Sequence, residues 1–351
     1  MTEPGSAPVE PGPGGAAVKT RAAVSGPSVL SVAALLRQAS NRFALVGVWG
    51  LLILVYGLVE PTTFLRVGTF QTIFNSQGTL VFLVLGLLCT ITVGEFVDLS
   101  IASNLGLAAI VVPVLAVNHG WNVWAASLVA LLASVAVGML NGILVVYCGI
   151  NTIVVTLGMG TFLTGIGLWI SNLALVSGLS HGFGQIALYS WWGLPAWFWY
   201  GVVAVALFAY VLGCTPLGTH IRFVGASHEV SRLAGIPVSR VRFGAFTMGG
   251  FFCGIGGVLS AAALGGFDPT VSATYLLPAF AATFLGTAVI QPGMFNPVGS
   301  WIAVFFLSTG VLGLQLLTGS GWVADVFYGG VLVGAVAIST LLSRRSGART
   351  A

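Results

Sequence analysis

Two carboxylates interrupt a long apolar stretch in the first third of the chain. Glu95 and Asp98 lie in the string GEFVDLS between two apolar runs. Because an unpaired carboxylate at membrane depth is costly, such a break needs a role. Asp98 and Ser100 could cap a helix that begins near Ile101, which accounts for Asp98 better than for Glu95. Both carboxylates are therefore candidates for a functional site.

The other polar candidates are neutral amides and hydroxyls within or beside apolar runs. A transport pathway is expected where helices break and polar groups face inward, and Glu95 and Asp98 would lie near its inner end. Neutral groups suit a polyhydroxylated, uncharged solute, whereas a cation or proton relay needs several carboxylates or histidines at depth. For any one residue, a hydrogen bond between packed helices is the simpler explanation. The remaining pathway candidates are Asn104, Asn141, Asn151, Thr156 and Gln315.

No residues in the sequence have the spacing of a catalytic or metal site. The GxxxxGK[ST] phosphate loop is missing, and Lys19 is the only lysine. The four cysteines lack metal-ligand spacing, and the four histidines are scattered. We therefore expect no metal, no cofactor and no ATP hydrolysis by this chain. The histidines, all expected in solvent, are His119, His181, His220 and His228.

The composition places the chain in a membrane. Hydrophobic residues make up 57% of the sequence and charged residues only 6%, whereas soluble domains have about 25% charged residues. Arginines lie at the flanks of apolar runs and form no continuous basic surface, which argues against nucleic-acid binding. We predict an all-α polytopic membrane protein with about ten transmembrane helices, some of them broken or re-entrant. The expected spans are 43–59, 80–94, 101–117, 123–147, 153–172, 195–213, 243–264, 275–290, 298–317 and 322–342.

The placement of arginines orients these spans. Four basic residues lie in the polar interval 215–242, which places this loop on the cytoplasmic side. An even number of spans then puts both termini in the cytoplasm, with Arg66 as the one exception. We expect a proline-rich, disordered tail at 1–42, a transmembrane domain at 43–342 and a basic tail at 343–351.

Glycines at a spacing of four predict close helix approach. Gly138 and Gly142, and likewise Gly250 and Gly254, form GxxxG patterns within expected spans. Small residues at this spacing let helix backbones meet. We expect them to pack helices within the chain.

Two short strings indicate an internal repeat. The string from Gly94 to Ala102 matches residues 265–272 in glycine, phenylalanine, aspartate and hydroxyl when one residue is skipped. Asn122 and Asn296 match at a later offset, as do Asn141 and Gln315. Five spans in each half would make this an inverted repeat. Helix capping alone would also explain both aspartates.

The loop at 215–242 contains a candidate short helix. Ser227 could cap it, and Gly235 followed by Pro237 would end it. A short amphipathic helix between two membrane halves offers a docking element for another protein. A solvated connector is the alternative.

This loop resembles the cytoplasmic loop of ribose/xylose-type ABC importer permeases. The resemblance rests on Gly218, Val224-Gly225, Glu229 and the string 233–236. It extends to the GDLS-like string at 94–100 and covers about 43–342. In that family the loop is a coupling helix that docks on the ATPase subunit, which here implies Glu229, Arg232, Leu233, Gly235 and Ile236 as coupling residues.

The resemblance implies the permease of an ABC importer for a small sugar similar to ribose, xylose or galactose. Its partners would be a cytoplasmic ATPase, an extracytoplasmic sugar-binding protein, and a second copy or homologue of the permease in a bacterial inner membrane. The alternative is an ion-coupled secondary transporter, which would not need the loop at 215–242. A membrane enzyme is a third class, for which no catalytic residues can be assigned.

Overall fold

The computed structural model describes residues 32–95, 97–291 and 293–347. It describes side chains between 45 and 337, apart from residues 96 and 292.

The chain divides into two units, 1–38 and 39–351, and every contact given below lies within the second. Most of the tail expected at 1–42 lies outside the described residues. From Val32 onward the chain is helical, so the first helix begins before the expected boundary. The last helix likewise runs to Gly347, into the expected C-terminal tail.

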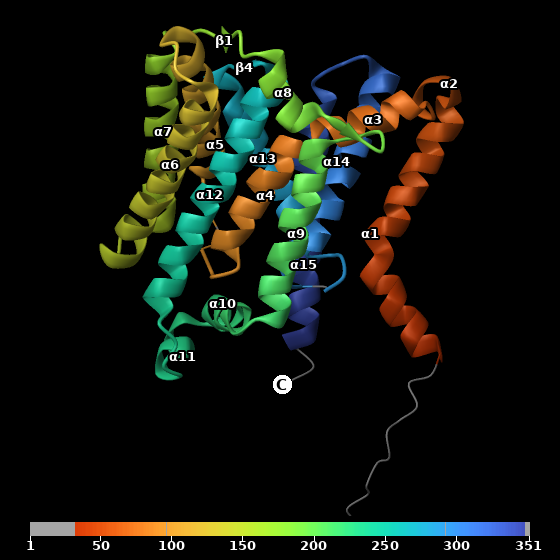
Figure 1. Cartoon of the computed structure of the whole chain (residues 1–351). Coiled ribbons are helices and arrows are strands. Elements are labelled where there is room, and N and C mark those ends of the chain that lie inside the picture. Colours follow the sequence, from red (N-terminus) through yellow and green to blue (C-terminus); the bar gives the residue numbers. More distant parts are fainter. Residues whose placement is uncertain (1–31, 96, 292, 348–351) are drawn as a thin grey trace, which may run out of the picture. The chain divides into compact units, whose positions relative to one another are not determined.

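Helices form most of the described chain (Figure 1). The α-helices are α1 Val32–Val59, α2 Pro61–Phe64, α3 Val67–Ser76, α4 Gly78–Ile91, α5 Ile101–Pro113, α6 Val123–Gly142, α7 Thr152–Ile170, α8 His181–Leu188, α9 Ala196–Cys214, α10 Pro216–Ala226, α11 His228–Leu233, α12 Val238–Leu264, α13 Leu276–Gly286, α14 Pro297–Thr318 and α15 Val323–Gly347. The π-helical turns Val114–Asn118 and Ile143–Tyr147 continue α5 and α6, and the 3₁₀ helix Pro269–Tyr275 precedes α13. The strands are β1 Val176–Ser177, β2 Ser190–Trp191, β3 Leu194–Pro195 and β4 Gly266–Phe267.

Seven helical stretches of the described chain are long and apolar enough to cross a membrane. The shorter apolar helices Leu45–Val59 and Val323–Ala337 lie within α1 and α15. These findings confirm the expected all-α polytopic architecture. The seven stretches are Val67–Ile91, Ile101–Asn118, Val123–Tyr147, Thr152–Ile170, Ala196–Cys214, Val238–Leu264 and Pro297–Thr318.

Two expected spans differ from the structure. The span expected at 80–94 begins at Val67, because α3 and α4 follow each other with only Gln77 between them. The span expected at 275–290 contains α13, a helix of 11 residues. At a rise of 1.5 Å per residue, α13 is about 17 Å long, well short of a hydrocarbon core of about 30 Å. This short helix fits the expectation of broken or re-entrant elements.

The long helix α12 packs against α4, α5 and α6 and forms the centre of the unit. A Cβ atom added to Gly138 of α6 would lie 2.5 Å from the carbonyl oxygen of Phe246. One added to Gly250 of α12 would lie 2.6 Å from the carbonyl oxygen of Ser134. The Ser134 hydroxyl also donates to the Gly250 carbonyl at 2.8 Å. Only glycine permits this approach, which confirms the expected packing within the chain.

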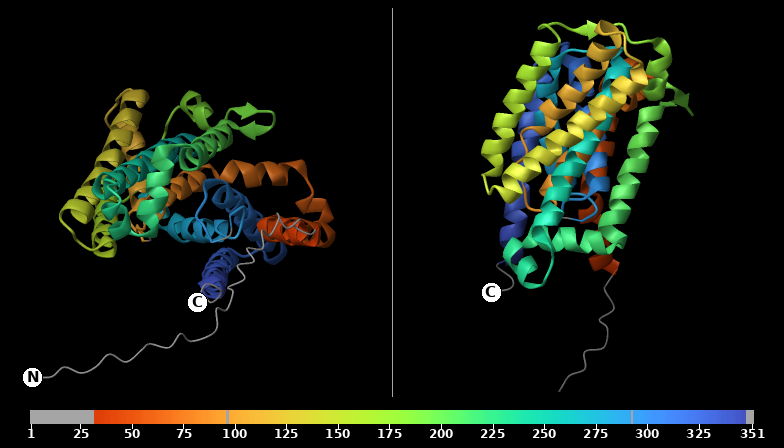
Figure 2. Two further views of the ribbon diagram at one scale, coloured as in Figure 1. Left: turned by 90° about the horizontal axis from the view of Figure 1, so that it is seen from below. Right: turned by 60° about the vertical axis from the view of Figure 1, so that its left-hand side comes forward.

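The two matching strings lie at opposite ends of the unit (Figures 1 and 2). The turn after α4 lies at the end that holds α10 and α11, and Gly94 is beside His228. At the other end, β4 pairs antiparallel with β1, so that Phe267 is opposite Val176. An inverted repeat requires equivalent motifs at opposite ends, and it stays a prediction.

Candidate transport and coupling sites

The short helix expected in the loop at 215–242 is α11. The Ser227 hydroxyl accepts a hydrogen bond from the backbone N–H of Val230 at 3.4 Å, as a cap should. Gly235, with φ of +79°, ends the helix in the left-handed conformation that glycine favours. A second amphipathic helix, α10, precedes it and was not expected from the sequence.

The expected coupling residues divide into two groups. Glu229, Arg232, Leu233 and Gly235 are exposed, and Leu233 is 86% exposed. Ile236 instead packs against a cluster of buried residues that includes Val93, Val224 and Val241. The first group is available to a partner, whereas Ile236 anchors the loop to its own unit.

His228 is not in solvent, contrary to the sequence expectation. Its side chain is half-buried, and its Nε2 atom lies 2.8 Å from the carbonyl oxygen of Val93. A buried carbonyl needs a donor, which the imidazole N–H can supply. On α10, Gly225 faces the same turn, and a Cβ atom there would overlap the carbonyl oxygen of Thr92. The loop at 215–242 is therefore held against the turn that follows α4.

Glu95, in the same turn after α4, connects this turn with α7 and α12. The Nε atom of Arg242, at the start of α12, donates to one Glu95 oxygen at 2.7 Å, and the two side chains form an ion pair. The Thr152 hydroxyl, at the start of α7, donates to the other oxygen. Glu95 is 6% exposed, so the partners offset the cost of burying its charge. Arg242 and Thr152 were not among the expected site residues.

Asp98 holds the turn before α5, but Ser100, which was also expected to cap this helix, makes no side-chain cap hydrogen bond. Its Oδ1 atom accepts hydrogen bonds from the backbone N–H and the hydroxyl of Ser100, at 3.1 and 2.7 Å. Burial raises the pKa of Asp98 to about 6, although the hydrogen bonds from Ser100 act in the opposite direction. Ser100 in turn accepts from Asn141 Nδ2 at 2.8 Å. The hydrogen bond between Asn141 and Ser100 thus links α6 to the start of α5.

Three of the neutral candidates lie in the same buried region. Asn104 Nδ2 donates to the Ser134 carbonyl at 3.2 Å, and the Thr156 hydroxyl donates to the Thr152 carbonyl at 2.8 Å. The amide oxygens of Asn104 and Asn141 are buried and accept no hydrogen bond from the described residues. These amides join helices and still retain acceptors for another group.

The last two candidates lie apart from this cluster. Asn151 is exposed and caps α7, where its side chain accepts from the Ile153 N–H at 2.9 Å. Gln315 lies on α14, which packs chiefly against α13, α15 and α9. The structure therefore brings together Glu95, Asp98, Asn104, Asn141 and Thr156. In the described part of the chain, no His, Cys, Asp and Glu residues gather in a group that could hold a metal ion.

Comparison with known proteins places this geometry in a family. Residues 69–336 match the model of the family described as "Branched-chain amino acid transport system / permease component". The chain is 29% identical over 272 residues to the Autoinducer 2 import system permease protein LsrC of Salmonella paratyphi B, covering 77% of this chain and 78% of that protein. It is 28% identical over 302 residues to the L-arabinose ABC transporter permease protein AraH of Azospirillum brasilense, covering 83% and 88%. A second permease of the Salmonella paratyphi B system, LsrD, is 28% identical over 304 residues, covering 85% and 90%.

No solved structure matches the chain. The family match, the relative named as an ABC transporter permease and the apolar helices confirm the resemblance to ABC importer permeases. The family is one of transport subunits, not of enzymes. The chain therefore belongs to the family of permease components of branched-chain amino acid transport systems.

Proposed function

We propose that this chain is the membrane-spanning subunit of an ABC importer that carries a small sugar into a bacterial cell. A separate cytoplasmic ATPase supplies the energy, and an extracytoplasmic binding protein delivers the sugar. Membership of the permease family supports this function, and the relative named for L-arabinose supports a sugar of that size. The candidates are ribose, xylose, galactose and arabinose.

The coupling loop is the observation that carries the proposal. Exposed Glu229, Arg232 and Leu233 face away from the unit, while His228 holds the same helix against the turn before Glu95. Movement of α11 would thus be transmitted to the joint, by which we mean the contacts of Glu95, in the turn after α4, with Arg242 of α12 and Thr152 of α7. An ion-coupled secondary transporter has no need of such a docking element.

The sugar pathway, in this proposal, follows α5, α6 and α7. Asn104, Asn141 and Thr156 offer amide and hydroxyl groups there, and two amide oxygens have no partner among the described residues. Asn151 lies at the N-terminal end of α7, and Gln315 would contribute a side chain from α14. Glu95 and Asp98 act in this scheme as structural residues at the inner end of the pathway.

The importer would contain two permease subunits, in the bacterial inner membrane with both termini and the coupling loop in the cytoplasm. A second copy or a homologue could serve as the partner. The two permeases named for one import system, LsrC and LsrD, are both similar to this chain and support the heteromeric arrangement.

Sugar uptake with and without the ATPase tests this function. Cells would express the permease with its binding protein, and uptake of labelled arabinose, ribose, xylose and galactose would be measured. We expect uptake of at least one sugar to require the ATPase and to persist when ionophores collapse the ion gradients. Uptake that needs no ATPase and stops with the ionophores would instead identify a secondary transporter.

A further inference from the structure

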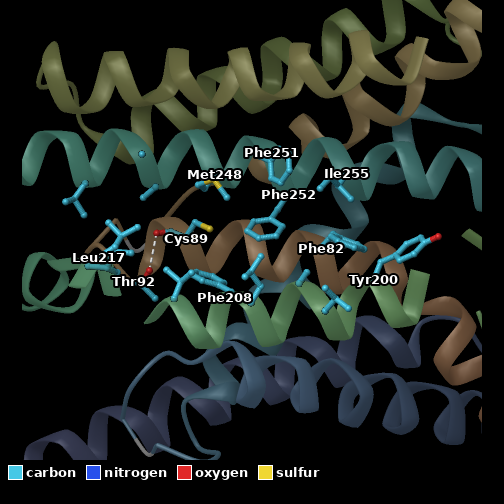
Figure 3. Close-up of a pocket in the computed structure, with 18 of the residues that line it drawn as sticks. Phe82, Cys89, Thr92, Tyr200, Phe208, Leu217, Met248, Phe251, Phe252 and Ile255 are labelled. Atoms are coloured by element: carbon cyan, nitrogen blue, oxygen red, sulfur yellow. Dashed lines mark hydrogen bonds between the residues drawn. The ribbon is translucent and has the colours of Figure 1, made fainter. Parts of the chain in front are cut away.

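A deep apolar groove of about 690 Å³ lies between α9 and α12. Figure 3 shows α4 at its base, with Phe82 and Cys89 between the two flanking helices. Phe208 of α9 and Phe252 of α12 stack near its middle, with ring centroids 6.1 Å apart. The groove shares no residue with the polar cluster around Asn104 and Asn141, so it is separate from the proposed sugar pathway.

Residues of α10 and an arginine line one end of the groove. Leu217 and Ile221 of α10 line that end, and so does Arg240 from the first turn of α12. Arg240 is exposed and forms no ion pair with the described residues, whereas Arg242 is paired with Glu95. An arginine with no ion pair among the described residues therefore lines one end of a largely apolar groove.

The length of the groove suits an acyl chain. Its lining on α12 runs from Arg240 to Leu259, which corresponds to about 28 Å of helix. This distance exceeds one leaflet of a hydrocarbon core that is about 30 Å thick. Along this lining, Gly244 has no atom within 4 Å of the position that a Cβ would occupy. The chain leaves this space open.

We propose that the groove binds an anionic phospholipid, with one acyl chain between α9 and α12 and the phosphate on Arg240. The helices that form the groove cross a membrane, so lipid is the medium that surrounds it. A sugar would lose its hydrogen bonds to water in an apolar groove and gain few in return. An anionic headgroup gains from an arginine at the membrane surface. Because α10 lines the groove and leads into α11, the lipid contacts the coupling loop directly.

Lipid titration of the purified, delipidated full-length chain tests whether the charge of Arg240 contributes to lipid binding. Native mass spectrometry would measure binding of dioleoylphosphatidylglycerol and of dioleoylphosphatidylcholine, which share their acyl chains. We expect tighter binding of the anionic lipid, and Arg240→Gln should weaken it about fivefold, as expected for one basic residue at the surface. Binding of the zwitterionic lipid should weaken less, because its choline group offsets the charge of its phosphate. Arg222→Gln is the matched control, because Arg222 is an exposed arginine of α10 that does not line the groove.

A second variant tests the groove itself. Gly244→Leu places a side chain in the open space and should reduce binding of both lipids at least tenfold. Gly158→Leu, at an equally open glycine of α7, is the control and should have no effect. Unchanged phosphatidylglycerol binding in Arg240→Gln overturns the proposal, whether or not Gly244→Leu folds. A change from dimer to monomer in Gly244→Leu with unchanged lipid binding would also overturn it, since the groove would then be an interface between copies of the chain.

Discussion

The turns at 94–100 and 265–272 share one hydrogen-bond pattern at opposite ends of the unit. Asp98 accepts from the backbone N–H and the hydroxyl of Ser100. Asp268 accepts from the backbone N–H and the hydroxyl of Thr270, at 2.9 and 2.7 Å. In both turns an aspartate thus holds the residue two positions later and starts the next helix. The similar strings in the sequence have a similar local structure.

The surroundings of the two turns differ. Asp98 is buried, and its turn contains Glu95, which is paired with Arg242 and lies close to α11. Asp268 is partly exposed, and its turn contains Gly266, which pairs with Ser177 of β1. Backbone hydrogen bonds close the second turn, whereas charged side chains and the coupling loop hold the first. The same aspartate hydrogen-bond pattern therefore accompanies an ion pair and a contact with α11 at one end, and a pairing of two short strands at the other.

The largest expected effect comes from breaking the charged joint. Arg242→Met leaves Glu95 buried without its counter-ion and should lower the free energy of unfolding by about 3 kcal/mol. Thermal unfolding of the purified chain in detergent measures this loss. The double variant Glu95→Gln/Arg242→Met should recover most of it. If Arg242→Met has the same melting temperature as the exposed control Arg240→Met, the ion pair does not stabilise the buried Glu95.

Glycine substitutions distinguish the two ends. A Cβ at Gly225 would overlap the Thr92 carbonyl, and one at Gly266 would overlap the Val176 carbonyl. Gly225→Ala and Gly266→Ala should each destabilise the chain by about 2 kcal/mol through overpacking. Only Gly225→Ala should also weaken co-purification of the ATPase. Equal effects of both variants on the ATPase would contradict the difference between the turns.

The stability of the chain should depend on pH through Asp98. The pKa of Asp98 is raised to about 6 from 3.8. Between about pH 4 and 6 the folded chain therefore keeps a proton on Asp98 that the unfolded chain has released. This contribution to stability is fully present below about pH 4 and is lost as the pH rises through 6. Asp98→Asn should flatten this part of the stability profile by roughly 1–3 kcal/mol. Melting temperatures between pH 4 and 7.5 provide the measurement, and an unaltered profile in Asp98→Asn would contradict the assignment.

The smallest stability effect is expected at His228. His228→Ala removes one hydrogen bond to the Val93 carbonyl and should cost about 1 kcal/mol. Sugar uptake should fall more than stability, because the ATPase would still bind α11 and move it without moving the joint. His220→Ala, on α10, is the control. Full uptake by His228→Ala would remove this contact from the coupling route.

Local patterns in the sequence predicted much of the fold. The caps of α11, the helix Val123–Tyr147 and the close approach of Gly138 to α12 depend on neighbouring residues or on regular spacing. The extra turns at the start of the span Val67–Ile91 were missed, because the polar residues of α3 resemble a loop. Helix α10 was missed for the same reason.

The contacts of the candidate site were largely beyond prediction from sequence. Glu95 was recognised as unexplained, but its partner Arg242 is 147 positions away. A lone unexplained carboxylate and an arginine at the edge of a span could have suggested this pair. Nothing comparable indicated that His228 would contact Val93, since spacing along the chain carries no information about how separate elements dock.

Docking of α11 on an ATPase is the central claim, and the affinity of the complex tests it most directly. Glu229→Arg reverses an exposed charge at the start of α11, and a mismatched interface charge costs about 2 kcal/mol or more. The ATPase should therefore bind the variant about thirtyfold more weakly, as measured by titration of the purified ATPase against the permease in nanodiscs. Asp325→Arg, a charge reversal on α15, should bind like the wild type. Equal affinity of Glu229→Arg and the wild type would contradict the account.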